Sequence, residues 1–398
     1  MKVKSNSVEV ISVDLLKPQT DTIYRGDNLN ILRALPDKCV DFIYIDPPFF
    51  TQRNYKNIGG DRESVFDYED NFFDGFQDTK DFFEQHIQSD AKGLKAYLEW
   101  MRTRVVELHR ILKPTGSFYL HLDHHAAHYM KVICDEIFGY SNFRNEIVWQ
   151  RKIGTNSTGK AKSWPNNSDY ILFYTKSSKY TFNAIYSDDS ENLPESITKR
   201  YRHDDDNKKG LYCLGPLEAP SDSPTLKFKF KGIESPRKGW RWKKERMNEA
   251  FKDGLLVINR EKKSIQQKMY LSKRKGMIVE SIWTDIRCVQ GGSKEYVGWP
   301  TQKPLALLER ILSASTNEGD IILDCFAGCG TSMHAAHNLK RKWIGIDISP
   351  TAIDVNSKRL EEIGAKVNVV DENELPVKLK SRANQNHNVS EGISESKI

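Results

Sequence analysis

A carboxylate, two prolines and two aromatic rings follow one another at Asp46-Pro47-Pro48-Phe49-Phe50. The residues before them, Val40 to Ile45, are apolar except for Asp41, and this pattern predicts a buried strand. Each proline lacks an N–H and restricts the residue before it, so the chain leaves the strand in a stiff, extended loop. Such a loop could hold an amino group of a planar molecule and stack a ring on it. A plain strand end with a capping aspartate explains this stretch equally well.

A second candidate site is the turn from Asp324 to Thr331, which contains Gly328 and Gly330. It lies between a predicted strand and a predicted helix, where glycines let the main chain approach a ligand. Asp347 ends the next predicted strand, where a carboxylate can accept ribose hydroxyls. Met333 occupies the place of the third glycine of pyrophosphate-binding turns, which argues against a nicotinamide-dependent oxidoreductase. A nucleoside without phosphates, such as S-adenosylmethionine, fits this turn better.

Strand and helix patterns alternate around both sites. The predicted strands are 40–45, 117–122, 145–153, 169–174, 321–323, 343–347 and 366–370, and the predicted helices are 28–35, 94–112, 124–138, 305–315, 333–339 and 350–363. This alternation predicts an α/β fold, in which ligands bind at the carboxyl ends of the strands. A single sheet would place the Asp46 loop beside the glycine turn.

Three stretches interrupt the alternation and suggest how the chain is divided. Residues 51–93 are polar and aromatic without periodicity, which is typical of a lid, a binding loop or disorder, and we expect a loop that holds the DNA substrate. Residues 181–277 are basic and aromatic, and 376–398 have the composition of a disordered tail. We therefore expect a catalytic part in 1–180, an inserted region in 181–277, a cofactor-binding part in 278–375 and a tail in 376–398.

The inserted region interleaves cations with aromatic rings in Lys227-Phe228-Lys229-Phe230-Lys231 and again in 237–244. The first run predicts a strand with one cationic and one apolar face. Cations that neutralise phosphates and rings that stack on bases are the expected chemistry of a nucleic-acid interface. The candidate DNA contacts are Lys227, Lys229, Arg241, Lys243 and Lys244. A solvated face over a small core is the alternative, which this segment alone slightly favours.

The composition of the whole chain narrows the class of protein. The 398 residues carry a net charge of +6 with a sequence pI of about 8.7, which permits a nucleic-acid partner without requiring one. No apolar run is long enough to span a bilayer, and the N-terminus lacks the apolar core of a signal peptide. The six cysteines have no framework spacing, so we expect a reduced, cytoplasmic compartment.

Two further motifs resemble a metal site and a phosphate-binding loop but lack residues that these sites require. The histidines 121, 124, 125 and 128 suggest a metal cluster, but they lack an intervening glutamate and an obvious third ligand, so we favour a polar helix start and expect no metal site. The stretch 154–161 nearly matches a phosphate-binding loop. Ala161 lacks the hydroxyl that would hold magnesium, and Trp164-Pro165 follows where a helix must begin. We interpret this stretch as a flexible loop rather than as part of an ATPase.

The motif Asp46-Pro47-Pro48-Phe49 early in the chain and 326–331 late in the chain together resemble the DNA amino-methyltransferases, in the order of their β group. The resemblance extends over roughly 20–180 and 278–370. It includes the segments 26–27, 146–149, 169–172, 300–304 and 343–347, of which 146–149 and 169–172 resemble adenine-specific and type III modification-subunit relatives. Phe49 replaces the commoner Tyr, and Asp347 stands where many relatives carry Glu.

The resemblance implies a Rossmann-like methyltransferase sheet that uses S-adenosylmethionine, with 181–277 as an inserted target-recognition region. It assigns Asp46, Pro47, Pro48 and Phe49 to catalysis. The residues that it assigns to the cofactor are Asp27, Lys303, Asp324, Phe326, Ala327, Gly328, Gly330, Thr331, Asp347 and Ile348.

The implied reaction is methylation of N6 of an adenine that is flipped out of double-stranded DNA at a specific sequence. Asp46 and the Pro47 carbonyl would accept the two N–H groups, and Phe49 would stack on the base. Cytosine-N4 relatives usually carry Ser in place of Asp46, but cytosine-N4 methylation and a degenerate DNA- and cofactor-binding module stay open as alternatives. Carbon-5 methylation is disfavoured because no Cys follows a Pro. A restriction-nuclease subunit and a homodimer are compatible partners, in a restriction-modification or an orphan role.

Overall fold

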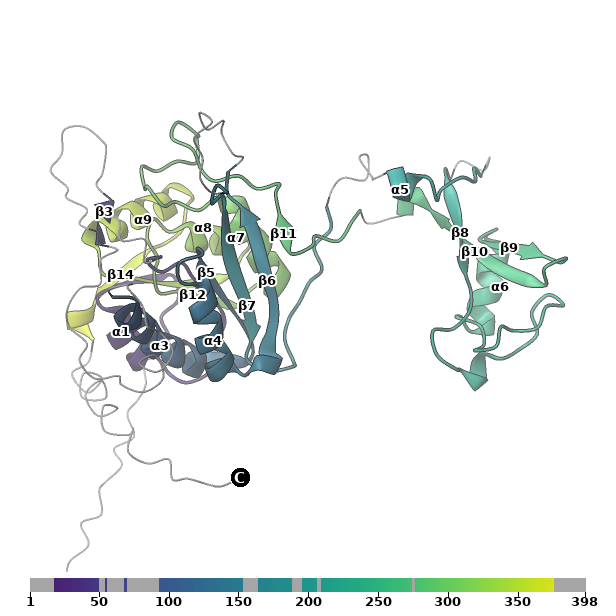
Figure 1. The fold of residues 1–398 in the computed structure, drawn as a ribbon, viewed down its shortest axis with the longest axis horizontal. Coiled ribbons are helices and arrows are strands. Elements are labelled where there is room, and N and C mark those ends of the chain that lie inside the picture. The colour runs from purple at the N-terminus through teal and green to yellow at the C-terminus, as the bar shows by residue number, and fades with distance from the viewer. Residues whose placement is uncertain are drawn as a thin grey trace, which may run out of the picture. The chain divides into compact units, whose positions relative to one another are not determined.

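The computed structural model describes residues 18–49, 54–55, 68–69, 93–152, 164–187, 195–205, 209–273 and 276–375. The chain divides into two compact units, Met1–Asn183 with Glu280–Ile398, and Ala184–Val279 (Figure 1). The predicted loop 51–93 lies outside the described residues except for Gly93 and two short strands, β3 (Asn54–Tyr55) and β4 (Tyr68–Glu69). The predicted loop 154–161 and the tail 376–398 also lie outside them.

Unit 1 is built on one sheet of nine described strands in the order β11-β6-β7-β5-β2-β12-β13-β1-β14. The strands are β1 Thr22–Arg25, β2 Val40–Ile45, β5 Leu112–Leu122, β6 Phe143–Gln150, β7 Ser168–Thr175, β11 Ile282–Trp283, β12 Ile321–Asp324, β13 Lys342–Asp347 and β14 Asn368–Asp371. Neighbours are parallel except at β7, which is antiparallel to both β5 and β6. The predicted α/β fold is therefore confirmed.

Helices cover both faces of this sheet. They are α1 Asn28–Ala34, α3 Leu94–Ile111, α4 Ala127–Phe138, α7 Leu305–Ser315, α8 Thr331–Asn338 and α9 Pro350–Glu362, with short 3-10 turns at Tyr140–Asn142 and Glu372–Glu374. Helices α1, α3 and α4 pack side by side on one face (Figure 1). Ile43 and Ile45 of β2 join their apolar core. Phe42 points the other way to Tyr119, whose hydroxyl bonds Ser315 of α7 at 2.7 Å.

The pairing of β2 with β12 brings the two halves of the sequence together. Phe42 pairs with Ile322 and Ile43 with Leu323, so both strands end at the same edge of the sheet. The carboxyl ends of β13 and β1 follow along that edge. This register confirms that the Asp46 loop lies beside the glycine turn.

Unit 2 is a small module with its own core. Its strands β8 (Tyr212–Pro216), β10 (Ser264–Tyr270) and β9 (Leu256–Asn259) form an antiparallel sheet, accompanied by helices α5 (Glu195–Thr198) and α6 (Lys244–Lys252) and by 3-10 turns at Pro224–Leu226 and Leu271–Lys273. The strand predicted at 227–231 is wrong: only Phe230 makes an isolated bridge, to Ile233. Phe230 and Trp240 are buried in the core, because the module has few other large apolar side chains to fill it.

A helix that crosses a bilayer must be both long and apolar, and the helices of the described residues differ from this. None of them combines the length and the apolar character that crossing a bilayer requires.

Candidate active site

A cavity of about 910 Å³ opens at the edge where β1, β2, β12 and β13 end. All the cofactor residues predicted from the sequence line it except Gly330. Of the predicted catalytic residues, Asp46 and Pro48 line the cavity, whereas Pro47 and Phe49 do not. The tertiary structure therefore gathers most of both predicted sets around one space.

The glycine turn folds onto the carboxylate of Asp347. The N–H of Gly328 donates to Asp347 Oδ2 at 2.8 Å, and the N–H of Ser349 donates to Oδ1 at 2.9 Å. Burial raises the pKa of Asp347 above its ordinary value, and these two N–H groups act in the opposite direction. Gly330 caps α8 with a φ of +80°, and a Cβ there would lie 2.1 Å from Asn356 Oδ1. Gly330 thus shapes the turn from outside the cavity.

Asp324 stabilises the same turn through hydrogen bonds that its carboxylate accepts. Its Oδ1 accepts the N–H of Phe326 at 2.9 Å, and its Oδ2 accepts the hydroxyl of Ser332. Burial raises the pKa of this carboxyl to about 7. Both oxygens are thus committed to the protein, and the role of Asp324 is to hold the turn in shape.

Asp27 has a structural role as well as a place in the cavity lining. Its Oδ1 caps α1 by accepting the N–H of Leu29 at 2.7 Å. The buried Arg104 lies 3.2 Å from the same oxygen, donates to Asn28 Oδ1 at 2.6 Å and covers the ring of Trp100 at 3.8 Å. Burial lowers the pKa of Arg104 to about 10. This cluster joins α1 to α3 at the cavity wall.

Asp46 also lines the cavity and follows β2 directly. Its Oδ2 forms an ion pair with the ammonium of Lys303, while its Oδ1 is buried and has no hydrogen-bond partner among the described residues. The Lys303 ammonium also lies 5.0 Å from the centre of the Phe49 ring. Lys303, assigned to the cofactor by resemblance, thus contacts two residues that the same resemblance assigned to catalysis.

A row of buried polar side chains packs against the Asp46 loop and supports it. The ring of His121 stacks on Phe49 at 5.7 Å, and its Nδ1 lies 2.8 Å from the hydroxyl of Tyr44. Its Nε2 lies 3.2 Å from Asp169 Oδ2. Burial raises the pKa of Asp169, but the bond from His121 and the nearby cations outweigh it, so the net pKa is lowered. Because Asp169 accepts from Nε2–H, we assign the Tyr44 hydroxyl as donor to Nδ1.

The two sites coincide with a family-wide sequence pattern. The profile of a family described as DNA methylase, with N6 and N4 methyltransferases as its members, matches residues 40–358. That range includes both the Asp46 loop and the glycine turn. The chain belongs to this DNA methylase family. Its reaction is the methylation of DNA and its cofactor is S-adenosylmethionine, as the resemblance implied.

Three curated relatives of the methylase show how far the similarity extends. The type II methyltransferase M.EcaI of Enterobacter cloacae is 29% identical over 91% of this chain and 75% of its own length. The type III restriction-modification enzyme StyLTI Mod subunit of Salmonella typhimurium is 27% identical over 80% of this chain and 50% of its own length. The DNA adenine methyltransferase YhdJ of Escherichia coli is 26% identical over 86% and 83%. This methylase thus spans about half of the type III subunit.

The cavity residues of the methylase fit S-adenosylmethionine. Ile348 presents an apolar side chain that is 70% exposed in the cavity lining, suited to cover a flat adenine ring. Asp347 would hold the ribose hydroxyls. Gly328 lines the cavity with a φ of +48°, which favours glycine, and it places no Cβ there that would narrow the space for a ligand. When bound, the cofactor supplies a methyl group on a positively charged sulfur.

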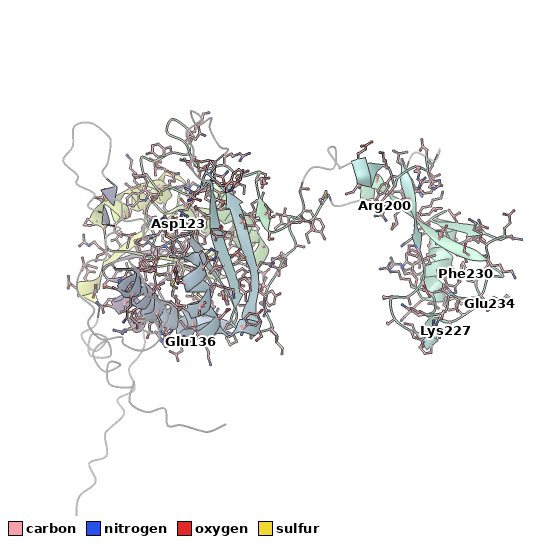
Figure 2. All side chains as sticks on the ribbon, in the orientation of Figure 1. Asp123, Glu136, Arg200, Lys227, Phe230 and Glu234 are labelled. Carbon is pink, nitrogen blue, oxygen red and sulfur yellow. The ribbon has the colours of Figure 1, made fainter. Side chains whose placement is uncertain are left out.

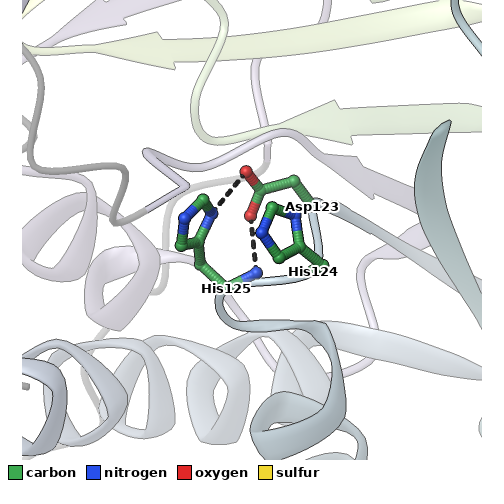
Figure 3. Close-up of side chains that lie close together, drawn as sticks. All are labelled: Asp123, His124 and His125. Atoms are coloured by element: carbon green, nitrogen blue, oxygen red, sulfur yellow. Dashed lines mark hydrogen bonds and ion pairs between the residues drawn. The ribbon is translucent and has the colours of Figure 1, made fainter. Parts of the chain in front are cut away.

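The four histidines 121, 124, 125 and 128 lie in different surroundings. Asp123, His124 and His125 have potential ligand atoms within 4.8 Å of one another (Figure 3). Both oxygens of Asp123 contact His125, one at its N–H and one at Nδ1, at 2.9 and 2.8 Å. His128 lies instead beside the ring of Tyr170, and His121 belongs to the row of buried polar side chains that packs against the Asp46 loop. The predicted helix begins at Ala127, so 123–126 form the turn that starts it.

The basic residues predicted to bind DNA lie in unit 2 and differ in their surroundings. Lys227 pairs with Asp222 at 2.6 Å and Lys229 with Glu234 at 3.2 Å. Lys227 and Glu234 are labelled in Figure 2. Arg241, Lys243 and Lys244 are exposed, and in the part of the chain that the structure describes they form no ion pair. These three cations are therefore the ones available to a phosphate.

Sequence reasoning missed several residues that the structure brings to these sites. His121 and Asp169 could have been noticed as polar residues inside apolar strands. In unit 2, Arg200, Arg202 and His203 line a second cavity of about 350 Å³. Neither arginine forms an ion pair with a described residue. No local pattern marked them, because they come from a loop between two short elements.

Proposed function

We propose that this DNA methylase transfers the methyl group of S-adenosylmethionine to N6 of an adenine that is flipped out of duplex DNA at a specific sequence. The observation that carries the proposal is the buried Asp46 Oδ1. It has no hydrogen-bond partner in the part of the chain that the structure describes, and Asp46 lines the cofactor cavity. A buried acceptor without a donor calls for a ligand that supplies an N–H. The exocyclic amino group of a base supplies two.

In the proposed reaction Asp46 and the Pro47 carbonyl accept the two N–H groups of the target. These contacts localise the nitrogen lone pair and orient it for in-line attack on the methyl carbon, so that orientation supplies most of the acceleration. The carbon–sulfur bond breaks with its electron pair left on sulfur, and the nitrogen gives up one proton towards Asp46. Phe49 stacks on the base, supported from below by His121.

Adenine is favoured over cytosine by the identity of residue 46. An aspartate at this position resembles the adenine-specific relatives, and YhdJ, named as an adenine methyltransferase, is similar over most of both chains. Cytosine N4 is the alternative target, because its amino group could make the same two contacts.

We assign the recognition of the DNA sequence to the inserted region 181–277. Its support is the separate small core of unit 2 and the exposed cations around it, namely Arg241, Lys243 and Lys244. Arg200 and Arg202, at the second cavity, extend this set. The type III relative is named as a subunit of a restriction-modification enzyme, so a nuclease partner fits a restriction-modification role, and a homodimer or an orphan enzyme is the alternative.

The test is to express the chain in cells that lack other DNA methylation and to map modified bases on their plasmid DNA. We expect N6-methyladenine at one short sequence. Asp46→Ala should abolish this signal while isothermal titration still shows S-adenosylmethionine binding, because Asp46 is not among the predicted cofactor residues.

Each other outcome rejects a defined part of the proposal. N4-methylcytosine in place of N6-methyladenine would establish the cytosine alternative. Cofactor and DNA binding without any modified base would identify a degenerate binding module. Full activity of Asp46→Ala would refute the role of the carboxylate.

A further inference from the structure

Lys303 contacts the ring and the carboxylate that the proposed function assigns to the target base, although it holds Oδ2 of Asp46 and leaves Oδ1 without a hydrogen-bond partner among the described residues. Its ammonium pairs with Asp46 Oδ2 and lies 5.0 Å from the centre of the Phe49 ring. The side chains of Lys303 and Asp46 are only 10% and 18% exposed. In the absence of DNA the carboxylate and the ring, both required by the base, are thus already engaged by one cation.

The main chain of Lys303 is fixed, so only its side chain can move. The neighbouring Gln302 is buried, and its side chain bonds Val297 N at 2.9 Å and Glu295 O at 2.7 Å. The carbonyl of Lys303 itself accepts the hydroxyl of Thr331 at 3.3 Å. A lysine ammonium on a flexible stem of four carbons can swing aside from such an anchor.

The other neighbours of the Phe49 ring cannot make room in this way. His121 is fully buried and is held at both ring nitrogens, by Tyr44 and by Asp169. It belongs to a strand in the middle of the sheet. A base that stacks on Phe49 must therefore displace Lys303 rather than His121.

The displacement requires a replacement donor. A mostly buried carboxylate is costly to leave unpaired, so the ammonium can leave Oδ2 of Asp46 only when another N–H donor binds the carboxylate, as the target amino group does at Oδ1. An exocyclic amino group is such a donor, whereas a base without one offers nothing to the carboxylate.

We propose that Lys303 is a placeholder for the target amino group. It contacts Asp46 Oδ2 and the Phe49 ring in the free enzyme, and it yields only to a base whose exocyclic amino group is placed, like N6 of adenine, to reach the Asp46 carboxylate. This inference rests on the proposed function. It adds a selective step to base flipping, and it makes Lys303 a specificity-determining residue rather than part of the cofactor site.

The test uses the full-length methylase and duplexes that contain its mapped site. One duplex carries adenine at the target position. A second carries 2-aminopurine, whose amino group is at C2 rather than at C6, away from the position where Asp46 accepts it, and which becomes fluorescent when unstacked. With wild type we expect strong binding of the adenine duplex and a small fluorescence rise on the other. Lys303→Met removes the competing donor, so the fluorescence rise should become several-fold larger and the preference for adenine should shrink.

Lys303→Arg provides the opposite change. Its guanidinium can hold a carboxylate through two parallel bonds, so it should leave Asp46 less readily. We expect the fluorescence rise to fall below that of wild type. The paired measurements keep the inference testable if one of the variants folds poorly.

Lys113→Met is the matched control. Lys113 bonds both oxygens of Asp41 at 2.8 Å, at the far end of the same strand β2. Removing this pair should leave the fluorescence rise and the adenine preference unchanged.

Two results would overturn the inference. Equal fluorescence and equal preference in Lys303→Met and wild type would show that Lys303 does not compete with the base. A loss of kcat with unchanged flipping would show that Lys303 only supports Asp46. Methylation by wild type is measured in parallel, so a failure of the proposed function, with no methylated adenine at all, is recognised separately.

Discussion

Arg104 of unit 1 and Arg246 of unit 2 each lie over a tryptophan ring, and their surroundings differ. Arg104 of unit 1 lies 3.8 Å from the ring centre of Trp100, is buried, and bonds Asn28 and Asp27 of another helix. Arg246 of unit 2 lies 4.6 Å from Trp242 and is exposed. The first cation joins distant elements around the cofactor cavity. The second contributes charge to a surface.

The lysine ion pairs repeat this contrast. The Lys303 side chain is 10% exposed in its pair with Asp46, whereas that of Lys229 is 62% exposed in its pair with Glu234. Water and salt screen an exposed pair, so it contributes little to stability, but a buried pair cannot lose one partner without leaving a charge uncompensated. The Lys303–Asp46 pair therefore fixes the geometry of the cavity wall, whereas the Lys229–Glu234 pair of unit 2 remains at the surface.

The largest expected effect is on a buried carboxylate of unit 1. Asp46→Ala should lower the methylation rate on the order of 10³-fold, because the target amino group loses its acceptor and its orientation. Initial rates with labelled S-adenosylmethionine measure the change. Asp222→Ala, which removes the exposed carboxylate paired with Lys227 in unit 2, should change the rate little. Similar losses in both variants would contradict the comparison.

The next effect concerns the stability of unit 1 as a function of pH. The Asp324 carboxyl has a pKa raised by burial from 3.8 to about 7. Between these values the folded protein keeps a proton that the unfolded chain releases, so the free energy of unfolding falls as the pH rises through this window. The loss from this one group is on the order of 4 kcal/mol.

Urea unfolding at pH 5 and at pH 7.5 measures this pH dependence. Asp324→Asn should flatten it, because the amide does not titrate. An equally steep loss of stability in the variant would show that another group is responsible.

The two arginines over tryptophan rings provide the most direct comparison of the units. Arg104→Met should lower the free energy of unfolding by about 3 kcal/mol, because it leaves buried acceptors on α1 without a donor. Arg246→Met should cost less than about 1 kcal/mol, because its cation already faces water. Urea unfolding of both variants is the measurement. Equal costs would mean that burial does not distinguish the two sites.

The smallest effect is on DNA affinity and tests unit 2 alone. Replacing Lys243 and Lys244 by Gln should reduce the slope of log affinity against log salt by about 2, since each lost phosphate contact removes roughly 0.9. The pair Arg200→Gln and Arg202→Gln should act similarly. Lys227→Gln with Lys229→Gln should change the slope less, because acidic neighbours already occupy those lysines. Fluorescence anisotropy over a salt series measures these slopes. A larger reduction for the Lys227 and Lys229 variant than for the Lys243 and Lys244 variant would contradict the prediction.

The sequence predicted the elements around the site well, because their signals are local. Strand 40–45 agrees residue for residue with β2, since an apolar run stops at two prolines. Helix 305–315 is likewise α7, started by Pro304. The basic and aromatic run 227–231 misled the prediction. Alternation of Lys and Phe is equally compatible with a strand and with an irregular loop whose rings turn inward, and the need to fill the core of unit 2 decided the outcome.

The sequence by itself thus determined most strands of the main sheet, the two motifs and their order, because backbone restriction and hydrophobic periodicity act over a few residues. It missed β1, a strand of only four residues. Only the tertiary structure decided that Lys303 lies on Asp46, that His121 lies beneath Phe49, and that Asp324 braces the turn. These contacts depend on which strands become neighbours and in which register, as with β2 and β12. Such pairings are fixed by burial of the whole sheet between its helices, and no short stretch of the sequence contains that information.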